Sequence, residues 1–177
     1  MLGKRELAFL HWGLIPSWAE DPEISNRMIN ASSETAAGKP SFGSAFCKRR
    51  CLIPAGGFYE WQKTGGKKQP YFIHRADGKP FAFAGLWDHW EGGGEVIESC
   101  TILTTEANEL MRPIHDRMPV ILAAEDHGRW LDPKNDKPEA VQPLLRLYPS
   151  EALAAYPVTP LVNNPRNDKL ECIKPTG

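Results

Sequence analysis

The 177-residue sequence contains no long hydrophobic run, no strong net charge and few cysteines. Without about 18 consecutive apolar residues, no segment reads as a membrane-spanning helix, and residues 1–10 lack the apolar stretch of a signal peptide. The formal net charge of −1 excludes nucleic-acid binding through an overall positive charge, so any such contact must come from a local patch. We therefore expect a soluble, cytoplasmic protein that is nucleoid-associated if its source is bacterial.

The cysteines stand at Cys47, Cys51, Cys100 and Cys172, which is too sparse for a disulfide framework in a chain of this length. Cys47 and Cys51 are spaced like half of a zinc site, but no second Cys or His pair follows at metal-ligand spacing. A glycine-rich phosphate loop, a zinc-hydrolase motif and a nucleophile elbow are also missing from the sequence. We expect reduced, partly buried thiols, and neither a metal nor a small-molecule cofactor.

Turn-forming residues, by contrast, are plentiful. The 16 prolines and 15 glycines are spread along the chain, which favours short strands over long helices. Turn signals at 65–66, 77–78 and 92–94 separate apolar stretches, as in successive β-hairpins. Short helices are expected at 106–111, 124–131 and 138–147. The sequence thus predicts one α+β domain over residues 1–177, with a predominantly antiparallel, barrel-like β-sheet and a few short helices.

The first candidate for chemistry is Glu60, which lies in the aromatic segment Phe58-Tyr59-Glu60-Trp61. Alternation along a strand would place Phe58 and Glu60 on one face, and Tyr59 and Trp61 on the other. A carboxylate beside Phe58 would be partly desolvated, which suits it to proton transfer. The alternative, from the pattern alone, is an outward-facing glutamate on a half-exposed strand.

His115 and Asn30 are the other candidates. His115 stands in the segment Pro-Ile-His115-Asp116-Arg117-Met-Pro, and a histidine in such a loop can donate or accept a proton near neutral pH. Asn30 follows an apolar pair, and its amide could hold a sugar or carbonyl oxygen. The alternatives are a loop histidine that bonds to the backbone and an asparagine that serves a turn.

Several basic and aromatic residues are candidates for contact with nucleic acid. Basic residues at 48–50, at 67–68 and at 117 could contact phosphate, and tryptophans at 12, 18 and 61 could stack on unpaired bases. Charge runs also solvate surfaces and tryptophans also fill cores, so both interpretations stay open. The predicted DNA contacts are Trp18, Trp61, Arg49, Arg50 and Arg117.

The order and identity of these residues resemble the SOS-response-associated peptidase (SRAP) family. The main similar segments are 12–18, 29–31, 50–61 and 114–119. Residues 68–73, 83–87, 101–108 and 158–164 are similar as well. The resemblance therefore extends over nearly the entire chain, and it implies the family's fold.

The resemblance also implies a function. Family members recognise abasic sites in single-stranded DNA and become covalently joined to them through the cysteine that removal of the initiator methionine exposes. Its α-amine condenses with the aldehyde of the opened sugar, and its thiol then closes a thiazolidine. By resemblance, Glu60 shuttles protons during methionine removal and ring opening, His115 assists at the sugar oxygen, and Asn30 orients the reactive end. Trp18 and Arg117 match positions that contact DNA.

Two departures from the family pattern stand out. The family usually has arginine two residues after the asparagine, whereas this chain has Ser32, which removes a phosphate contact. The family begins Met-Cys-Gly-Arg, whereas this chain begins Met1-Leu2 and its residues 3–7 resemble a segment well inside the family. We expect the portion with the nucleophilic cysteine to be missing, through a fragment, a misplaced start codon or a natural short form. The chain as written is expected to form no stable adduct by this route.

Three functions remain open at this stage. The first is an SRAP-type protein acting on abasic single-stranded DNA, and whether this chain is itself an enzyme stays open. The second is a non-catalytic module that binds single-stranded DNA. The third is a conventional cysteine peptidase that uses Cys51 or Cys100 with His115, although neither cysteine stands in the context of a peptidase nucleophile.

Overall fold

The computed structural model describes residues 5–176, so the Met1-Leu2-Gly3-Lys4 start, compared above with the family's first residues, lies outside the described part. The chain divides into two compact units. Unit 1 takes in the described part of Met1–Ile53, together with Ala82–Thr105 and Pro119–Arg146, and unit 2 takes in Pro54–Phe81, Glu106–Met118 and the described part of Leu147–Gly177. None of the helices described is long and apolar enough to cross a membrane. The single-domain organisation stays a prediction.

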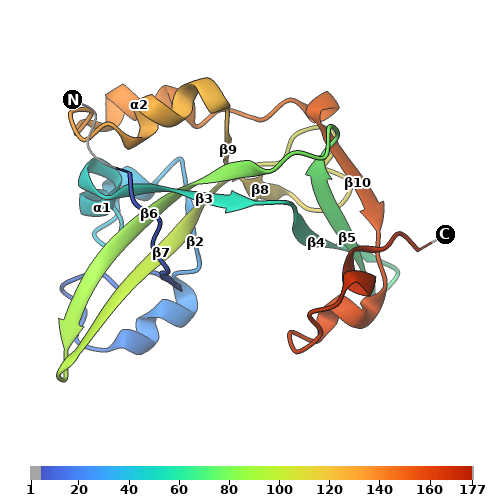
Figure 1. Ribbon diagram of the computed structural model, residues 1–177, viewed down its shortest axis with the longest axis horizontal. Helices are drawn as coiled ribbons and strands as arrows, with labels where there is room; N and C mark the ends of the chain where they lie inside the picture. The colour runs from blue at the N-terminus through green and yellow to red at the C-terminus, as the bar shows by residue number, and fades with distance from the viewer. Residues whose placement is uncertain (1–4, 177) are drawn as a thin grey trace. The chain divides into compact units, whose positions relative to one another are not determined.

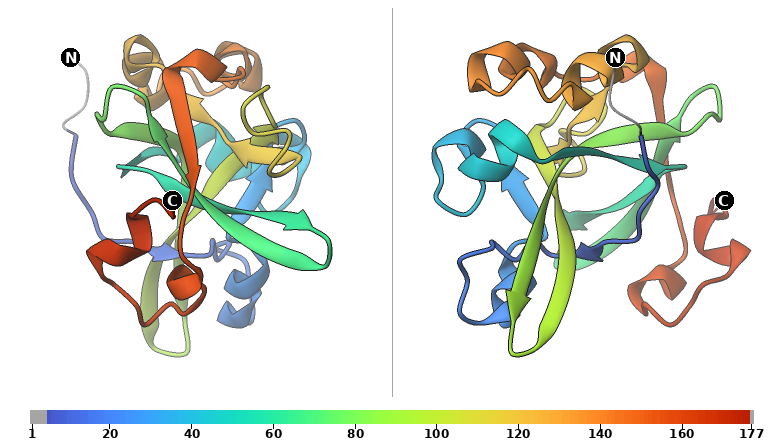
Figure 2. Two further views of the ribbon diagram at one scale, coloured as in Figure 1. Left: turned by 90° about the vertical axis from the view of Figure 1, so that its right-hand side faces the viewer. Right: turned by 60° about the vertical axis from the view of Figure 1, so that its left-hand side comes forward.

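The larger sheet has seven strands and is built around a long hairpin, which can be followed in green and yellow-green in Figures 1 and 2. The hairpin consists of β6 (Phe81–Gly92) and β7 (Glu95–Glu106), which pair antiparallel. β3 (Arg50–Ala55) and β9 (Ile121–Leu122) pair with β6, while β1 (His11–Trp12), β2 (Asn30–Ser32) and β8 (Arg117–Pro119) pair with β7. β1 and β2 run parallel to β7.

The smaller sheet lies in unit 2 and carries two of the candidate residues. Its order is β10 (Leu153–Pro157), β5 (Lys67–Arg75) and β4 (Phe58–Thr64), with every pairing antiparallel. Gly65 and Gly66 join β4 to β5 with φ values of 57° and 80°. A two-residue hairpin turn requires such positive φ angles, which glycine adopts without strain.

The helices are short. The α-helices are α1 (Gly43–Lys48), α2 (His127–Leu131) and α3 (Pro138–Val141). The 3-10 helices are η1 (Pro22–Arg27), η2 (Ala36–Gly38), η3 (Ala124–Asp126), η4 (Gln142–Leu144), η5 (Ser150–Ala152), η6 (Pro160–Asn163) and η7 (Leu170–Ile173). η3 with α2 confirms the helix expected at 124–131, and α3 with η4 confirms most of the one expected at 138–147.

The expected mixed fold, mostly strands with a few short helices, is confirmed. Two details differ. Both sheets have open strand orders, so neither closes into a barrel in the described part of the chain, and two of the pairings with β7 are parallel.

The helix expected at 106–111 is wrong. β7 continues to Glu106, and the chain then makes turns around Asn108, whose backbone and side-chain oxygens each accept the Met111 N–H at 3.1 Å. Pro113 has no N–H with which to continue a helix. The loop that carries His115 is therefore organised by Asn108 rather than by a helix.

A buried arginine clamps the core of unit 1. Arg50 is only 9% exposed, its guanidinium lies 5.5 Å from the centre of the Trp130 ring, and that ring packs edge-on against Phe46 at 6.1 Å. Its N–H groups donate to the backbone carbonyls of Phe46, Cys47, Trp130 and Asp132, at 2.6–2.9 Å. Burial lowers the pKa of Arg50, but an arginine keeps its charge in a protein. These donors are engaged inside the unit, so we do not retain Arg50 as a DNA contact.

We expect Arg50→Lys to destabilise the protein strongly. A lysine cannot reach four carbonyls arranged around a planar fork, so buried acceptors would lose their donors, at a cost of about 3 kcal/mol. For a chain of this size the melting temperature should fall by about 6–12 °C. Thermal unfolding followed by circular dichroism would measure this, with the exposed Arg166→Lys as the matched control. Equal melting temperatures for the two variants would show that the clamp contributes little.

Candidate functional site

Glu60 lies on one face of the smaller sheet, on the edge strand β4. The register places it opposite Tyr71 of β5, and its carboxylate accepts the N–H of Trp61 at 3.1 Å. The side chain is half-buried. Alternation puts Gln62 on this same face, which we call the Glu60 face: Phe58, Glu60 and Gln62 of β4 with Tyr71 of β5.

The Glu60 face holds the loop that carries His115. The Tyr71 hydroxyl donates to Gln62 Oε1 at 3.3 Å, and Gln62 Nε2 donates to the Pro113 carbonyl at 2.8 Å. His115 follows Pro113 by two residues, which limits the separation of their Cα atoms to about 7 Å. Glu60 lies about 6.6 Å from Gln62 along the strand. The structure thus attaches the His115 loop to the Glu60 face at Gln62.

The His115 loop closes on itself. At its base the Ala107 N–H donates to the Asp116 carbonyl at 3.0 Å, and near its tip the His115 N–H donates to the Met111 carbonyl at 2.9 Å. Buried Asn108 ties the loop to the rest of unit 2, because its Nδ2 donates to the Tyr148 carbonyl at 2.9 Å. The backbone around His115 is therefore fixed at three points.

The His115 ring has a partner for either protonation state of Nδ1. The Arg117 N–H donates to Nδ1 at 3.0 Å when that nitrogen is unprotonated. When it is protonated, the Asp116 carboxylate and the Arg117 carbonyl, each at 3.2 Å, can accept from it. The side chain is 40% exposed. A half-exposed imidazole that is satisfied with or without its proton is suited to proton transfer.

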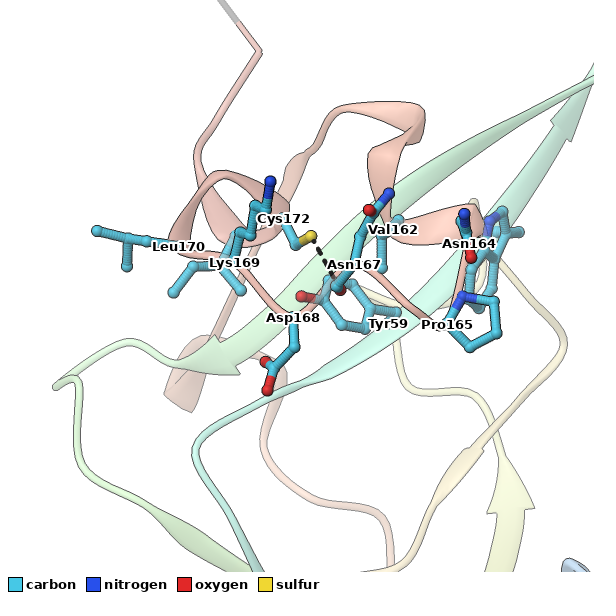
Figure 3. A pocket seen from close by; sticks show the side chains of 11 residues that line it. Tyr59, Val162, Asn164, Pro165, Asn167, Asp168, Lys169, Leu170 and Cys172 are labelled. Atoms are coloured by element: carbon cyan, nitrogen blue, oxygen red, sulfur yellow. Dashed lines mark hydrogen bonds between the residues drawn. The ribbon is translucent and has the colours of Figure 1, made fainter.

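The opposite face of the smaller sheet is aromatic and borders a cavity (Figure 3). Tyr59 packs against Phe72 at 5.4 Å and against Trp61 at 6.5 Å between ring centres. The cavity has a volume of about 510 Å³ and is lined by Tyr59, Trp61, Val162, Asn164, Pro165, Asn167, Asp168, Lys169, Leu170, Cys172 and Ile173. Burial raises the pKa of Tyr59, with Cys172 and Asp168 adding to the effect, so the phenol stays protonated. None of the predicted catalytic residues lines this cavity.

Trp61 therefore lies on the face of β4 opposite to Glu60, although the two are neighbours in sequence. Its indole N–H donates to Asn163 Oδ1 at 2.8 Å. A base stacked on the Trp61 ring would not lie on the Glu60 face. The predicted DNA contact at Trp61 and the predicted chemistry at Glu60 thus occupy different surfaces of unit 2.

Arg117 lies in unit 2 beside His115, whereas Trp18, Asn30, Arg49 and Arg50 lie in unit 1, where Asn30 and Trp18 are exposed. Asn30 begins β2, pairs in register with Ile102 and is preceded by Ile29, whose carbonyl accepts the Trp12 indole N–H at 2.8 Å. Trp18 is 59% exposed and borders a hollow lined by Trp18, Ala19, Glu20, Asp21, Glu23, Ile24, Asn26 and Arg27. The carboxylates there disfavour phosphate, while the ring remains available for stacking.

Arg49 and Ser32 are tied to carboxylates. Arg49 forms an ion pair with the buried Asp88 at 3.1 Å, which leaves its side chain 24% exposed. Ser32, which replaces the family's arginine, donates a hydrogen bond to Glu34.

Comparison with known proteins identifies one family. A family model described as SOS response associated peptidase (SRAP) matches residues 2–165. The chain is 48% identical to the abasic site processing protein YoqW of Bacillus subtilis over 170 residues, which are 95% of this chain and 76% of YoqW. It is 37% identical to the abasic site processing protein HMCES of Xenopus tropicalis over 198 residues, covering 96% of this chain and 57% of that protein.

Solved structures agree with the sequence comparison. A protein from Bacteroides thetaiotaomicron superposes with a TM-score of 0.86 at 32% identity, over 94% of this chain and 75% of the other. A protein from Bordetella bronchiseptica gives a TM-score of 0.78 at 36% identity, over 88% of this chain and 79% of the other.

The cysteines of unit 1 do not resemble peptidase nucleophiles. Burial, with a contribution from Cys100, raises the pKa of Cys51 to about 12, and burial also raises the pKa of Cys100. A nucleophilic cysteine needs the opposite shift, because the thiolate is the reactive form. Across residues 5–176, moreover, no three His, Cys, Asp or Glu side chains gather closely enough to hold a metal ion, so the Cys47–Cys51 half-site has no completing ligands there.

We expect Cys51 to resist alkylation in the folded protein. With a pKa of about 12, only about one Cys51 thiol in 10⁴ is ionised at pH 8. Iodoacetamide should therefore modify Cys51 far more slowly in buffer than in urea, as measured by peptide mass spectrometry. The labelling of all four cysteines in urea gives the reference rate for accessible thiols. Equal rates in the two conditions would reveal a reactive thiol and support the peptidase interpretation.

Proposed function

Because the chain belongs to the SOS response associated peptidase (SRAP) family, we propose that it recognises abasic sites in single-stranded DNA. The observation that supports this proposal is the hydrogen bond from Gln62, on the Glu60 face, to the carbonyl of Pro113 in the His115 loop. The relatives named above are abasic site processing proteins, and the match covers three quarters of YoqW. We propose that this chain acts on the substrate in their names, the abasic site.

In this proposal Glu60 acts as the general base and His115 acts as the general acid. An abasic sugar exists as a ring-closed hemiacetal and as an open aldehyde, and opening the ring moves a proton from the hydroxyl to the ring oxygen. Glu60 accepts and returns the hydroxyl proton. His115 donates to the sugar oxygen and is re-protonated at a nitrogen that finds a partner in either state. Arg117, next to His115, contacts the adjoining phosphate.

The covalent step implied by the family uses an N-terminal cysteine, which the chain as written does not have, so we propose this step only for a form that carries that cysteine. An N-terminal cysteine amine condenses with the aldehyde to an imine and water, and its thiol adds to the imine carbon to close a thiazolidine. Closing that ring requires amine and thiol on the same residue. Autoproteolytic removal of methionine, which gives the family the name peptidase, exposes that cysteine.

The remaining predicted contacts keep narrower roles. Asn30 is proposed to bind an oxygen of the DNA through its amide, and Trp18 to stack on an unpaired base, each from exposed positions of unit 1. Arg49 is proposed as a phosphate contact only through the part of its guanidinium that Asp88 leaves open. The proposed location is the cytoplasm, with association to the nucleoid if the source is bacterial.

We expect Glu60→Gln and His115→Ala to reduce the preference for abasic over intact strands. Each removes a charged or proton-exchanging hydrogen-bond partner of the sugar, worth about 1.5–3 kcal/mol, or at least tenfold in affinity. Fluorescence anisotropy with matched oligonucleotides, one of which carries a natural abasic site, would measure the ratio of dissociation constants. The melting temperatures should stay near that of the unaltered protein, because neither side chain lies in the core.

The exposed Glu95→Gln on β7 is the matched control and should leave the ratio unchanged. If the unaltered protein binds intact and abasic strands equally, the proposed recognition is wrong. If it prefers abasic strands and both variants keep that preference, the protein is a binding module and the roles of Glu60 and His115 are wrong.

A further inference from the structure

The tip of the β4–β5 hairpin gathers three exposed lysines around its two-glycine turn. The register places Lys63 directly opposite Lys68 and Thr64 opposite Lys67. Directly opposed residues of an antiparallel pair have Cβ atoms about 4.5–5.5 Å apart, and like charges in that arrangement destabilise the sheet. We call Lys63, Lys67 and Lys68 the lysine tip.

The charges of the lysine tip are not balanced from within the protein. Over residues 5–176 no carboxylate lies within ion-pair distance of Lys63, Lys67 or Lys68, whereas Lys174 pairs with Glu171 at 3.4 Å. Protection of a sheet edge can account for Lys63, since β4 is an edge strand. β10 pairs with β5 only over residues 71–75, so Lys67 and Lys68 project past its end, and edge protection is the alternative that the melting control below tests.

We propose that the lysine tip is a second contact for the DNA, which holds backbone phosphates outside the Glu60 face. The partner's identity rests on the proposed function, but the inference adds a site to it. A phosphate backbone is a run of closely spaced negative charges, so it can pair with all three ammonium groups and offset their mutual repulsion.

The geometry indicates which phosphates are held. Lys63 and the Thr64–Lys67 pair lie three and four residues from Glu60 along β4, or about 10–13 Å at the rise of a strand. Nucleotides stack about 3.4 Å apart along one strand and lie farther apart when extended. With the abasic sugar at Glu60, the strand reaches Lys67 on the same face two to four nucleotides away, on one side of the lesion only. Lys63 and Lys68 lie on the opposite face, so the strand meets them as it passes over the turn.

The first test uses an intact single strand, so that it does not depend on recognition of the abasic site. The variant is Lys63→Gln with Lys67→Gln and Lys68→Gln. Each lost phosphate contact should reduce the slope of log affinity against log salt by about 0.7, or about 2 for all three. The control is Lys39→Gln with Lys134→Gln and Lys137→Gln, which removes the same charge from exposed positions of unit 1. We expect the salt slope to fall clearly for the tip variant and to change little for the control.

The second test locates the phosphates with an abasic strand in which single phosphates are replaced by neutral methylphosphonates. Replacement two to four nucleotides from the lesion on one side should weaken binding by the unaltered protein several-fold, and should not weaken binding by the tip variant further. If the two effects instead add at every position, or if the salt slope is the same for both triple variants, the inference is wrong. A fall in the intact-strand slope with no preference for the abasic strand would uphold the lysine tip and overturn the proposed function.

The melting temperature of each variant serves as the control for its folding. Removing opposed like charges should leave the melting temperature of the tip variant unchanged or slightly raised. A variant that melts lower or aggregates, while its salt slope matches that of the control, would assign the lysines to edge protection and overturn the inference.

Discussion

Gly65 and Gly66 close a two-residue turn with φ values that other residues adopt only under strain, and this turn leaves β4 and β5 a single register. That register decides what stands beside Glu60. It places Tyr71 opposite the carboxylate and brings the Tyr71 hydroxyl to Gln62, whose amide binds the Pro113 carbonyl. A slip of one residue would turn Glu60 to the other face of the sheet and separate it from the His115 loop.

The same alternation gives the hairpin two separate surfaces. Glu60 and the His115 loop share one face, while Tyr59 and Trp61 line a cavity on the other. The side chains of residues that are neighbours in the sequence therefore lie in different environments. Glu60 lies on the face to which the His115 loop is attached, whereas burial raises the pKa of the Tyr59 phenol on the other face. This separation is why the conspicuous aromatic segment around Glu60 cannot be treated as one binding site.

Much of this arrangement is contained in short-range patterns. Strand alternation around Glu60, the glycine turn and the loop position of His115 were all predictable, and the register that pairs Glu60 with Tyr71 follows from counting outward from Gly65 and Gly66. The role of Gln62 was missed, because a hydrogen bond to Pro113 links residues 51 positions apart. Arg50 shows the reverse error: a basic run suggests solvent or phosphate, and only the fold reveals four carbonyls converging on one guanidinium. The sequence predicted a helix at 106–111, but Asn108 organises that segment into turns.

We propose that Glu60 and His115 together form the surface that meets the abasic sugar. A crystal structure of the protein bound to a single strand that carries one abasic site would test this. The sugar should lie within hydrogen-bonding distance of both the Glu60 carboxylate and the His115 imidazole. A sugar bound instead in the cavity beside Tyr59 and Asp168, with the Glu60 face empty, would contradict it.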